Sequence, residues 1–141
     1  FQRQGWKIGG TAPDTQAKFG IDEPFFAPFY QVWTSTDSNA ESKPKEITRG
    51  VEPKWVFKIG ETLDISNKDA IALQDIYPLI ECVHPAYELI EPRIVLESDS
   101  VEMPIQYLIA DMAWTGGVVI GAAKTCKELS YASWAEYHEK A

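Results

Sequence analysis

The chain has 141 residues, of which 45% are hydrophobic and 12% aromatic, a composition typical of a folded globular protein. Its formal net charge of −8 excludes a nucleic-acid partner from the expected functions, because phosphate binding needs clustered lysine and arginine. No apolar run is long enough to span a membrane as a helix. We expect a single domain over residues 1–141.

The first part of the chain predicts a strand followed by a helix. Residues 4–11 read as a short strand ending in a glycine turn, and residues 12–19 as a helix capped by Thr11 and ended by Gly20. The chain begins with Phe1 rather than methionine, which indicates either a removed targeting segment or part of a longer polypeptide.

Residues 22–30 contain two prolines and four aromatic side chains, which predicts a hydrophobic covering loop rather than a helix. Residues 31–36 favour a strand, and the polar residues 37–45 favour a mobile loop. The next strand is expected over residues 51–59. Its alternation places Trp55, Phe57 and Ile59 on one face, and Glu52, Lys54, Val56 and Lys58 on the other.

Short helices and further strands are expected in the rest of the chain. Ser66 is a candidate cap for a helix from Asn67 that Pro78 should kink or end. The remaining expected elements are a strand over 87–96 interrupted by Pro92, a short helix over 104–110, a buried strand over 117–122 and a last strand over 129–138. These elements predict a β-rich α+β fold with two or three short helices.

The two cysteines, Cys82 and Cys126, show no spacing typical of a zinc site. A single disulfide between them is an open alternative that no spacing indicates, and we expect instead two free buried thiols in a reducing compartment, cytoplasmic or mitochondrial matrix, with the compartment itself left open.

Three ionisable residues are candidates for a site, and each also has a purely structural interpretation. Lys7 precedes two glycines and could place its ammonium on a substrate carboxylate, or it could be a strand lysine that faces water. Glu52 and Glu88 could bind a hard cation such as magnesium or manganese, or could be strand glutamates paired with lysines. We interpret His84 as structural.

Several stretches, taken in order, resemble the fumarylacetoacetate hydrolase superfamily, in particular its 2-oxopent-4-enoate hydratase and 4-oxalocrotonate decarboxylase branch. The matching stretches span about residues 5 to 121 and are Gly5-Trp6-Lys7-Ile8-Gly9, Thr11, Gly20-Ile21-Asp22-Glu23-Pro24, Val51-Glu52-Pro53, Pro85-Ala86-Tyr87-Glu88-Leu89-Ile90, Arg93-Ile94, Ile109-Ala110-Asp111 and Val118-Val119-Ile120-Gly121.

The resemblance implies a mixed β-roll and a divalent metal, magnesium or manganese, that holds a small 2-oxo acid. Three acidic residues bind this metal in the family. Glu52 and Glu88 match two of them, while Lys54 stands where the family has the third. The resemblance further places Lys7 and Asp111 in the catalytic pocket, and Gly9 and Arg93 at the substrate.

Departures from the family pattern point to an impaired metal site. The Lys54 ammonium lies two residues from Glu52 on the same face, so it should repel a dication, and we hypothesise that it replaces the metal between Glu52 and Glu88. Met112 replaces a usual asparagine, and 91–93 reads Glu-Pro-Arg instead of Asp-Ser-Arg or Asp-Ala-Arg. The family's leading and trailing segments are also missing, so the roll is expected to be incomplete.

Two functions of different classes follow. One is a hydratase- or decarboxylase-like enzyme for a small 2-oxo acid, with magnesium or manganese if active and no cofactor otherwise. The other is a catalytically silent structural subunit. In both cases we expect an oligomer or a larger complex, because an incomplete roll would expose sheet edges and apolar surface.

Overall fold

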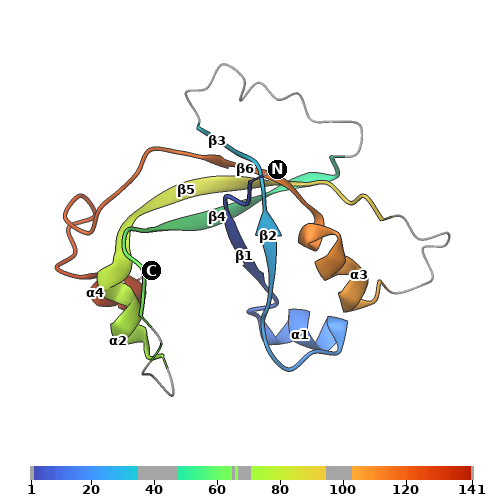
Figure 1. The fold of residues 1–141 in the computed structure, drawn as a ribbon, viewed down its shortest axis with the longest axis horizontal. Helices are drawn as coiled ribbons and strands as arrows, with labels where there is room; N and C mark the ends of the chain where they lie inside the picture. Colours follow the sequence, from blue (N-terminus) through green and yellow to red (C-terminus); the bar gives the residue numbers. More distant parts are fainter. Residues whose placement is uncertain (1, 35–47, 65, 67–70, 95–102, 141) are drawn as a thin grey trace. The chain divides into compact units, whose positions relative to one another are not determined.

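A computed structural model of the chain describes residues 2–34, 48–64, 66, 71–94 and 103–140 (Figure 1). The predicted α+β class is confirmed. In chain order, the elements are β1 (Gly5–Gly9), α1 (Pro13–Phe19), β2 (Phe25–Phe29), β3 (Val32–Thr34), β4 (Gly50–Ile59), α2 (Leu73–Ile76), the 3₁₀ turn η2 (Tyr77–Leu79), β5 (Ile80–Ile90), α3 (Ile105–Ala110), the turn η3 (Met112–Trp114), β6 (Thr115–Ile120) and α4 (Trp134–Lys140).

The described strands form two sheets. One is the antiparallel pair β1–β2, and the other has four strands in the order β3-β6-β5-β4. The chain divides into two compact units, the first made of Phe1–Pro53 and Tyr87–Val119 and the second of Lys54–Ala86 and Ile120–Ala141. A single domain over residues 1–141 stays a prediction.

The antiparallel β1–β2 pair, called the hairpin below although α1 lies in its connection, is visible as two adjacent strands in Figure 1. It belongs to the first unit and has an unusual distribution of side chains. Lys7 pairs with Ala27, which is fully buried, so the lysine is on the inner face. On the other face Trp6 is 51% exposed, Ile8 66% and Phe26 64%. The hairpin therefore turns a cation inward and apolar side chains outward, the reverse of the usual pattern for a half-buried sheet.

The prediction of a covering loop over residues 22–30 is wrong, because β2 lies within that range. Prolines exclude a helix interior, but proline is tolerated on a strand with an unpaired edge. Pro28, opposite Trp6, lies in a two-stranded sheet of this kind.

The helix predicted over residues 12–19 is confirmed as α1. Its N-cap is Ala12, with no side-chain cap, so the predicted capping by Thr11 is wrong. Gly20 ends the helix in the left-handed conformation at φ 63°, which glycine adopts without steric cost.

The core of the first unit joins the hairpin to α3 and to the η3 turn. Ala27, Leu108 and Ala113 are its buried residues. The predicted helix over 104–110 and the predicted strand over 117–122 correspond to α3 and β6. A side chain at Gly117 would collide with the Trp33 ring, so that glycine lets β3 approach β6 closely.

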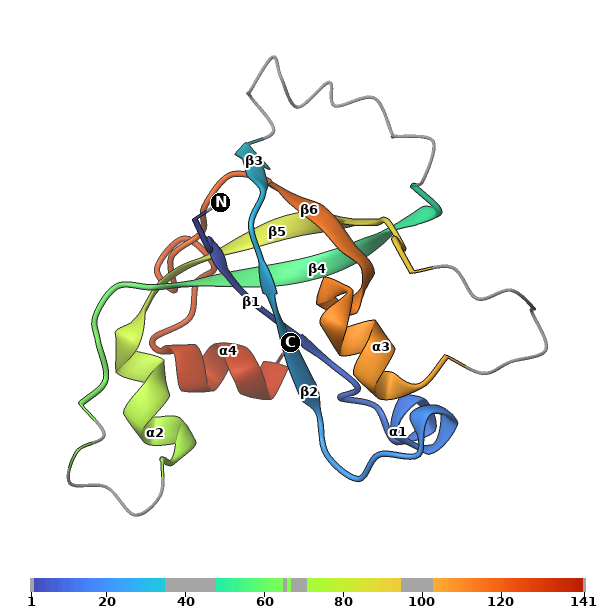
Figure 2. The same ribbon diagram turned by 45° about the vertical axis from the view of Figure 1, so that its right-hand side comes forward.

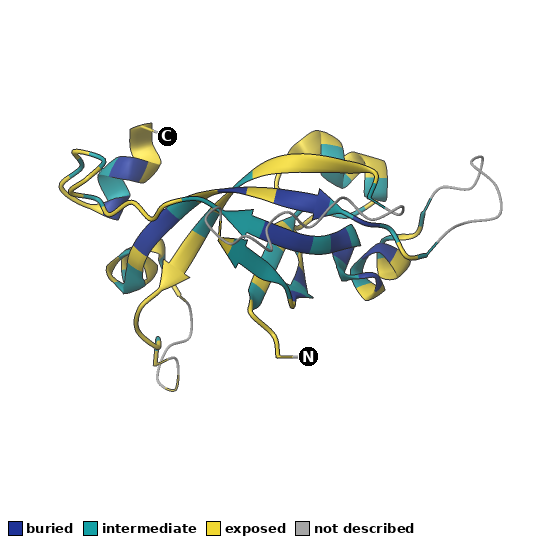
Figure 3. Cartoon of the chain, turned by 90° about the horizontal axis from the view of Figure 1, so that it is seen from above, coloured by how far each residue is buried: buried dark blue, intermediate teal, exposed yellow. Residues whose placement is uncertain are grey.

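The core of the second unit contains Val83, Trp134 and Tyr137. Trp134 and Tyr137 come from α4, which lies near α2 in Figure 2 and carries buried positions among exposed ones at the C-terminal label of Figure 3. The prediction of a strand over residues 129–138 is therefore wrong. Ser133 accepts a hydrogen bond from the Glu136 N–H at 3.1 Å, and Glu136 accepts one from the Ala132 N–H at 2.7 Å. These two bonds cap the first turn of the helix, and Trp134 and Tyr137 share its buried face.

Other predicted elements along the chain are confirmed in part. The helix expected from Asn67 begins later, at Leu73, and Pro78 lies in the 3₁₀ turn that follows it. Residues 67–70 lie outside the described residues, as does the loop predicted over 37–45. The strand predicted over residues 87–96 begins earlier, at Ile80, and ends at Ile90 before Pro92.

Both cysteines are free, as predicted. Burial raises the pKa of the Cys82 thiol above its ordinary value, and Glu81 adds to this effect. His84 is anchored through Nδ1, which donates to the Gly121 carbonyl at 2.9 Å. In the part of the chain that the structure describes, no helix is long and apolar enough to cross a bilayer.

Candidate functional site

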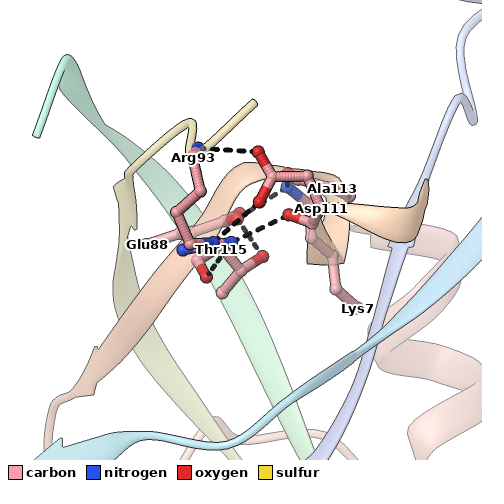
Figure 4. Close-up of polar contacts among 6 residues, drawn as sticks. All are labelled: Lys7, Glu88, Arg93, Asp111, Ala113 and Thr115. Atoms are coloured by element: carbon pink, nitrogen blue, oxygen red, sulfur yellow. Dashed lines mark hydrogen bonds and ion pairs between the residues drawn. The ribbon is translucent and has the colours of Figure 1, made fainter. Parts of the chain in front are cut away.

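Lys7 and Glu88 meet in the interior of the first unit. The alternation of β5 exposes Tyr87 by 59% and leaves Glu88 only 1% exposed, while the inner face of β1 carries Lys7. The Lys7 Nζ atom lies 2.6 Å from Glu88 Oε1 and 2.9 Å from the Ala113 carbonyl oxygen (Figure 4). The Thr115 hydroxyl donates to the same Oε1 atom at 2.7 Å. The Lys7 ammonium and the Thr115 hydroxyl thus both stabilise the charge of this buried carboxylate.

The η3 turn, which presents the Ala113 carbonyl to Lys7, has a strained backbone. Met112, Ala113 and Trp114 have φ values of 53°, 49° and 63°. Residues other than glycine rarely adopt this left-handed conformation, and three in succession are more unusual still. The Trp114 N–H donates to the Asp111 carbonyl at 2.9 Å and closes the turn. Strain of this kind persists only where the surrounding structure maintains it, and it is concentrated at functional sites.

Asp111 and Arg93 form a second polar cluster beside this turn (Figure 4). The Asp111 carboxylate accepts hydrogen bonds from Arg93 Nε and the Arg93 N–H, both at 2.7 Å, and from the Ile94 N–H at 2.9 Å. The Arg93 guanidinium also donates to the carbonyls of Asp111 and Thr115 at 2.8 and 3.2 Å. These bonds fasten the segment after β5 to the segment after α3. Both residues thus have clear positioning contacts, and their predicted catalytic and substrate-binding roles stay predictions.

Glu91 is a further buried acid in the first unit, 3% exposed, and accepts a hydrogen bond from the Thr48 hydroxyl at 2.9 Å. A Cβ atom at Gly116 would lie 2.3 Å from the Glu91 carboxyl carbon. Gly116, which looks like a simple turn residue in the sequence, therefore makes room for a buried carboxylate.

The other predicted site residues lie on β4 and β1. Glu52 is exposed and Lys54 half-buried, on the same face of β4. At Gly9 a Cβ atom would lie 2.5 Å from the Phe25 ring, so that glycine is needed for packing within the hairpin. The metal-binding role of Glu52 and Glu88 and the substrate role of Gly9 stay predictions.

The donor set of the described residues does not fit a metal centre with three carboxylates. Across residues 2–34, 48–64, 66, 71–94 and 103–140, no three His, Cys, Asp or Glu side chains are grouped so that they could hold an ion. The buried Glu88 carboxylate already has Lys7 and Thr115 as donors.

The sequence does not reveal two members of this site, Thr115 and the Ala113 carbonyl. Ala113 contributes only a backbone atom, so no residue type marks it. The sequence does carry a signal for Lys7. Because side chains alternate along a strand, Lys7 must point to the face opposite Trp6 and Ile8, where its neighbours on the same face are glycines.

No family model matches the chain. Among solved structures, the chain is similar to 4-oxalocrotonate decarboxylase from Pseudomonas putida G7 in two forms. With the form complexed with magnesium and adipate, the TM-score is 0.61 at 19% identity, over 90% of this chain and 46% of the other. With the form complexed with calcium and acetate, it is 0.64 at 17% identity, over 90% and 45%.

The chain shares its fold with 4-oxalocrotonate decarboxylase. The fold that the resemblance implies is thus confirmed, while membership of the fumarylacetoacetate hydrolase superfamily stays a prediction. The chain spans less than half the length of 4-oxalocrotonate decarboxylase.

Proposed function

We propose that this protein is a hydratase- or decarboxylase-like relative that takes a small 2-oxo acid and whose metal-dependent activity is impaired. The shared fold supports the ancestry. The single observation that carries the proposal is the 2.6 Å contact between Lys7 and the buried Glu88. An ammonium here meets the carboxylate that the family resemblance assigns to a metal.

The charge on β4 supports the same conclusion. Lys54 lies on the same strand face as Glu52, two residues away, where the resemblance implies a third acidic ligand. A lysine in place of a carboxylate removes one attraction for the metal ion and adds one repulsion. Each of these is on the order of several kcal/mol at short range in a partly buried site. Metal affinity should fall accordingly.

Restoring the acid tests this proposal. We expect the parent protein to show no change of melting temperature with magnesium, and the Lys54→Glu variant to gain one. At a magnesium concentration ten times Kd, binding stabilises the folded state by about 1.4 kcal/mol, which corresponds to roughly 4 °C. Differential scanning fluorimetry with magnesium, and with a chelator as the reference, measures it.

A matched control is available on the same strand face. Lys58→Glu makes the same charge change at an exposed residue that pairs with Glu81 at 2.6 Å, and it should give no magnesium response. The proposal fails if the parent already responds to magnesium or hydrates a 2-hydroxydienoate with magnesium present. It also fails if Lys54→Glu and Lys58→Glu behave alike.

A second candidate function, a structural subunit of a larger assembly, is favoured by the apolar outer face of the hairpin. Trp6, Ile8 and Phe26 are each at least half exposed, and large exposed apolar patches mark interaction sites. This function predicts that the protein purifies from its native source in a stable complex. A monomer in sedimentation analysis, with hydratase activity, would contradict it.

A further inference from the structure

The outer face of the hairpin is an apolar patch that lies open to solvent. Trp6, Ile8 and Phe26 are each more than half exposed, and the Trp6 and Phe26 rings pack edge to face with their centroids 5.4 Å apart. Together with Pro24 and Phe25, these side chains line a surface groove of about 430 Å³. The candidate site uses the opposite, inner face of the hairpin, so it does not explain this patch.

Charges of opposite sign flank the patch. In the antiparallel register the start of β1 lies beside the end of β2, so the residues before β1 and those before β2 lie at opposite ends of the hairpin. Before β1, Arg3 is exposed, and its guanidinium carbon lies 4.5 Å from the centre of the Trp6 ring. Before β2, Asp22 and Glu23 are both exposed. The patch therefore runs from a cationic end to an anionic end.

A patch with this polarity is complementary to itself. When a second copy faces the first and is turned by 180°, the cationic end of each hairpin meets the anionic end of the other, and the apolar side chains meet between them. Closed dimers use one surface twice in this way, and charged groups at the rim set the register. In the described part of the chain Arg3, Asp22 and Glu23 form no ion pair, so their charges are available to a partner.

We propose that the outer face of the hairpin binds a second copy of this chain in a closed two-fold dimer. Trp6, Ile8 and Phe26 form its apolar centre, and Arg3 of each copy lies against the acidic end of the other. This inference rests on the second candidate function and names the partner for it.

The size of the patch predicts a weak dimer. Two partly exposed aromatic rings and one isoleucine leave on the order of 300 Å² of apolar surface on each copy. A stable complex buries about 800 Å² on each partner. We therefore expect a dissociation constant on the order of 100 µM, and an association that high salt weakens, because its charged rim is exposed.

The experiment is sedimentation of the full chain, from about a tenth of this dissociation constant to about ten times it. Phe26→Thr removes an exposed ring but keeps a residue that favours strands, and it should weaken the dimer roughly tenfold. Ile8→Thr, which leaves the pair of Trp6 and Phe26 rings intact, should also weaken it. Circular dichroism of both variants shows that the fold is retained.

The matched control is Tyr87→Thr. Tyr87 is 59% exposed, close to the 64% of Phe26, and belongs to the same unit, but it lies on β5 rather than on the hairpin. This change removes as much exposed aromatic surface and should leave the dissociation constant unchanged.

Charge reversal tests the two-fold arrangement itself. Arg3→Glu makes both ends of the hairpin acidic, and Asp22→Lys combined with Glu23→Lys makes both ends basic. Each variant alone should dimerise at least about tenfold more weakly than the parent, because like charges meet. An equimolar mixture of the two should dimerise as tightly as the parent, because every end then meets the opposite charge.

A parent that stays monomeric over the whole range would overturn the inference. A dimer that neither Phe26→Thr nor Ile8→Thr weakens, a mixture of charge variants no tighter than either alone, or association that continues beyond the dimer would also overturn it. A monomeric parent found in a stable complex with a different protein would rule out the second copy and leave the second candidate function standing. The magnesium response of Lys54→Glu tests the impaired metal site separately from all these outcomes.

Discussion

The Lys7→Met variant is expected to lose about 3 to 5 kcal/mol of its free energy of unfolding, because it removes the ammonium that is bound to a buried carboxylate. Glu88 is 1% exposed, so water cannot take the place of the lost ammonium. The melting temperature should fall by roughly 10 °C or more in a chain of this length. Urea denaturation followed by circular dichroism measures the change.

A double-mutant cycle separates the ion pair from the packing of its side chains. Lys7→Met combined with Glu88→Leu should recover much of the loss, because an apolar pair of similar volume replaces the charges. The matched control is Lys58→Met. Lys58 pairs with Glu81 at the same 2.6 Å, but both side chains are about half exposed, so solvent screens the pair and stability should hardly change.

Equal effects of Lys7→Met and Lys58→Met would show that Glu88 is not desolvated in solution. If the double variant were no more stable than Lys7→Met, packing rather than charge would explain the loss. Either result would remove the support that the Lys7–Glu88 contact gives to the proposed function.

The parts of the fold that the sequence predicts correctly are those with a strong local signal. The apolar alternation of β4, the short helix α3 and the glycine that ends α1 depend on neighbouring residues, and each is confirmed. The two wrong elements have weaker local signals. β2 contains Pro28, and only its pairing with β1 makes a strand of it. α4 begins at a cap formed by Ser133 and Glu136, but the weak alternation of apolar and polar residues in this stretch favours a strand.

The site was predictable only in part, because its contacts join distant segments. Lys7 and Glu88 are 81 residues apart, and the sequence alone favours an exposed strand lysine. The position of Lys7 depends on the orientation of the β1–β2 pair, whose exposed face carries Trp6, Ile8 and Phe26. Alternation predicts that Lys7 and Trp6 point to opposite faces of β1. Which of the two faces is buried depends on the segment that packs against it, and in this structure that segment is the η3 turn with Ala113.

Asp111→Ala is the second change expected to have a large effect, about 3 kcal/mol or more of lost stability. The Asp111 side chain is 3% exposed and accepts three hydrogen bonds from Arg93 and Ile94. Without it two backbone N–H groups and a guanidinium lose their acceptor. Urea denaturation checks this value. Asp64→Ala is the control, because Asp64 bonds only Ser66, within an exposed turn, in the described residues.

A conservative variant tests whether the lost hydrogen bonds explain the effect. Asp111→Asn retains one acceptor oxygen and should restore part of the stability. An Asp111→Ala variant as stable as the parent would show that Asp111 does not fasten these two segments, because losing three hydrogen bonds to a buried carboxylate should lower stability.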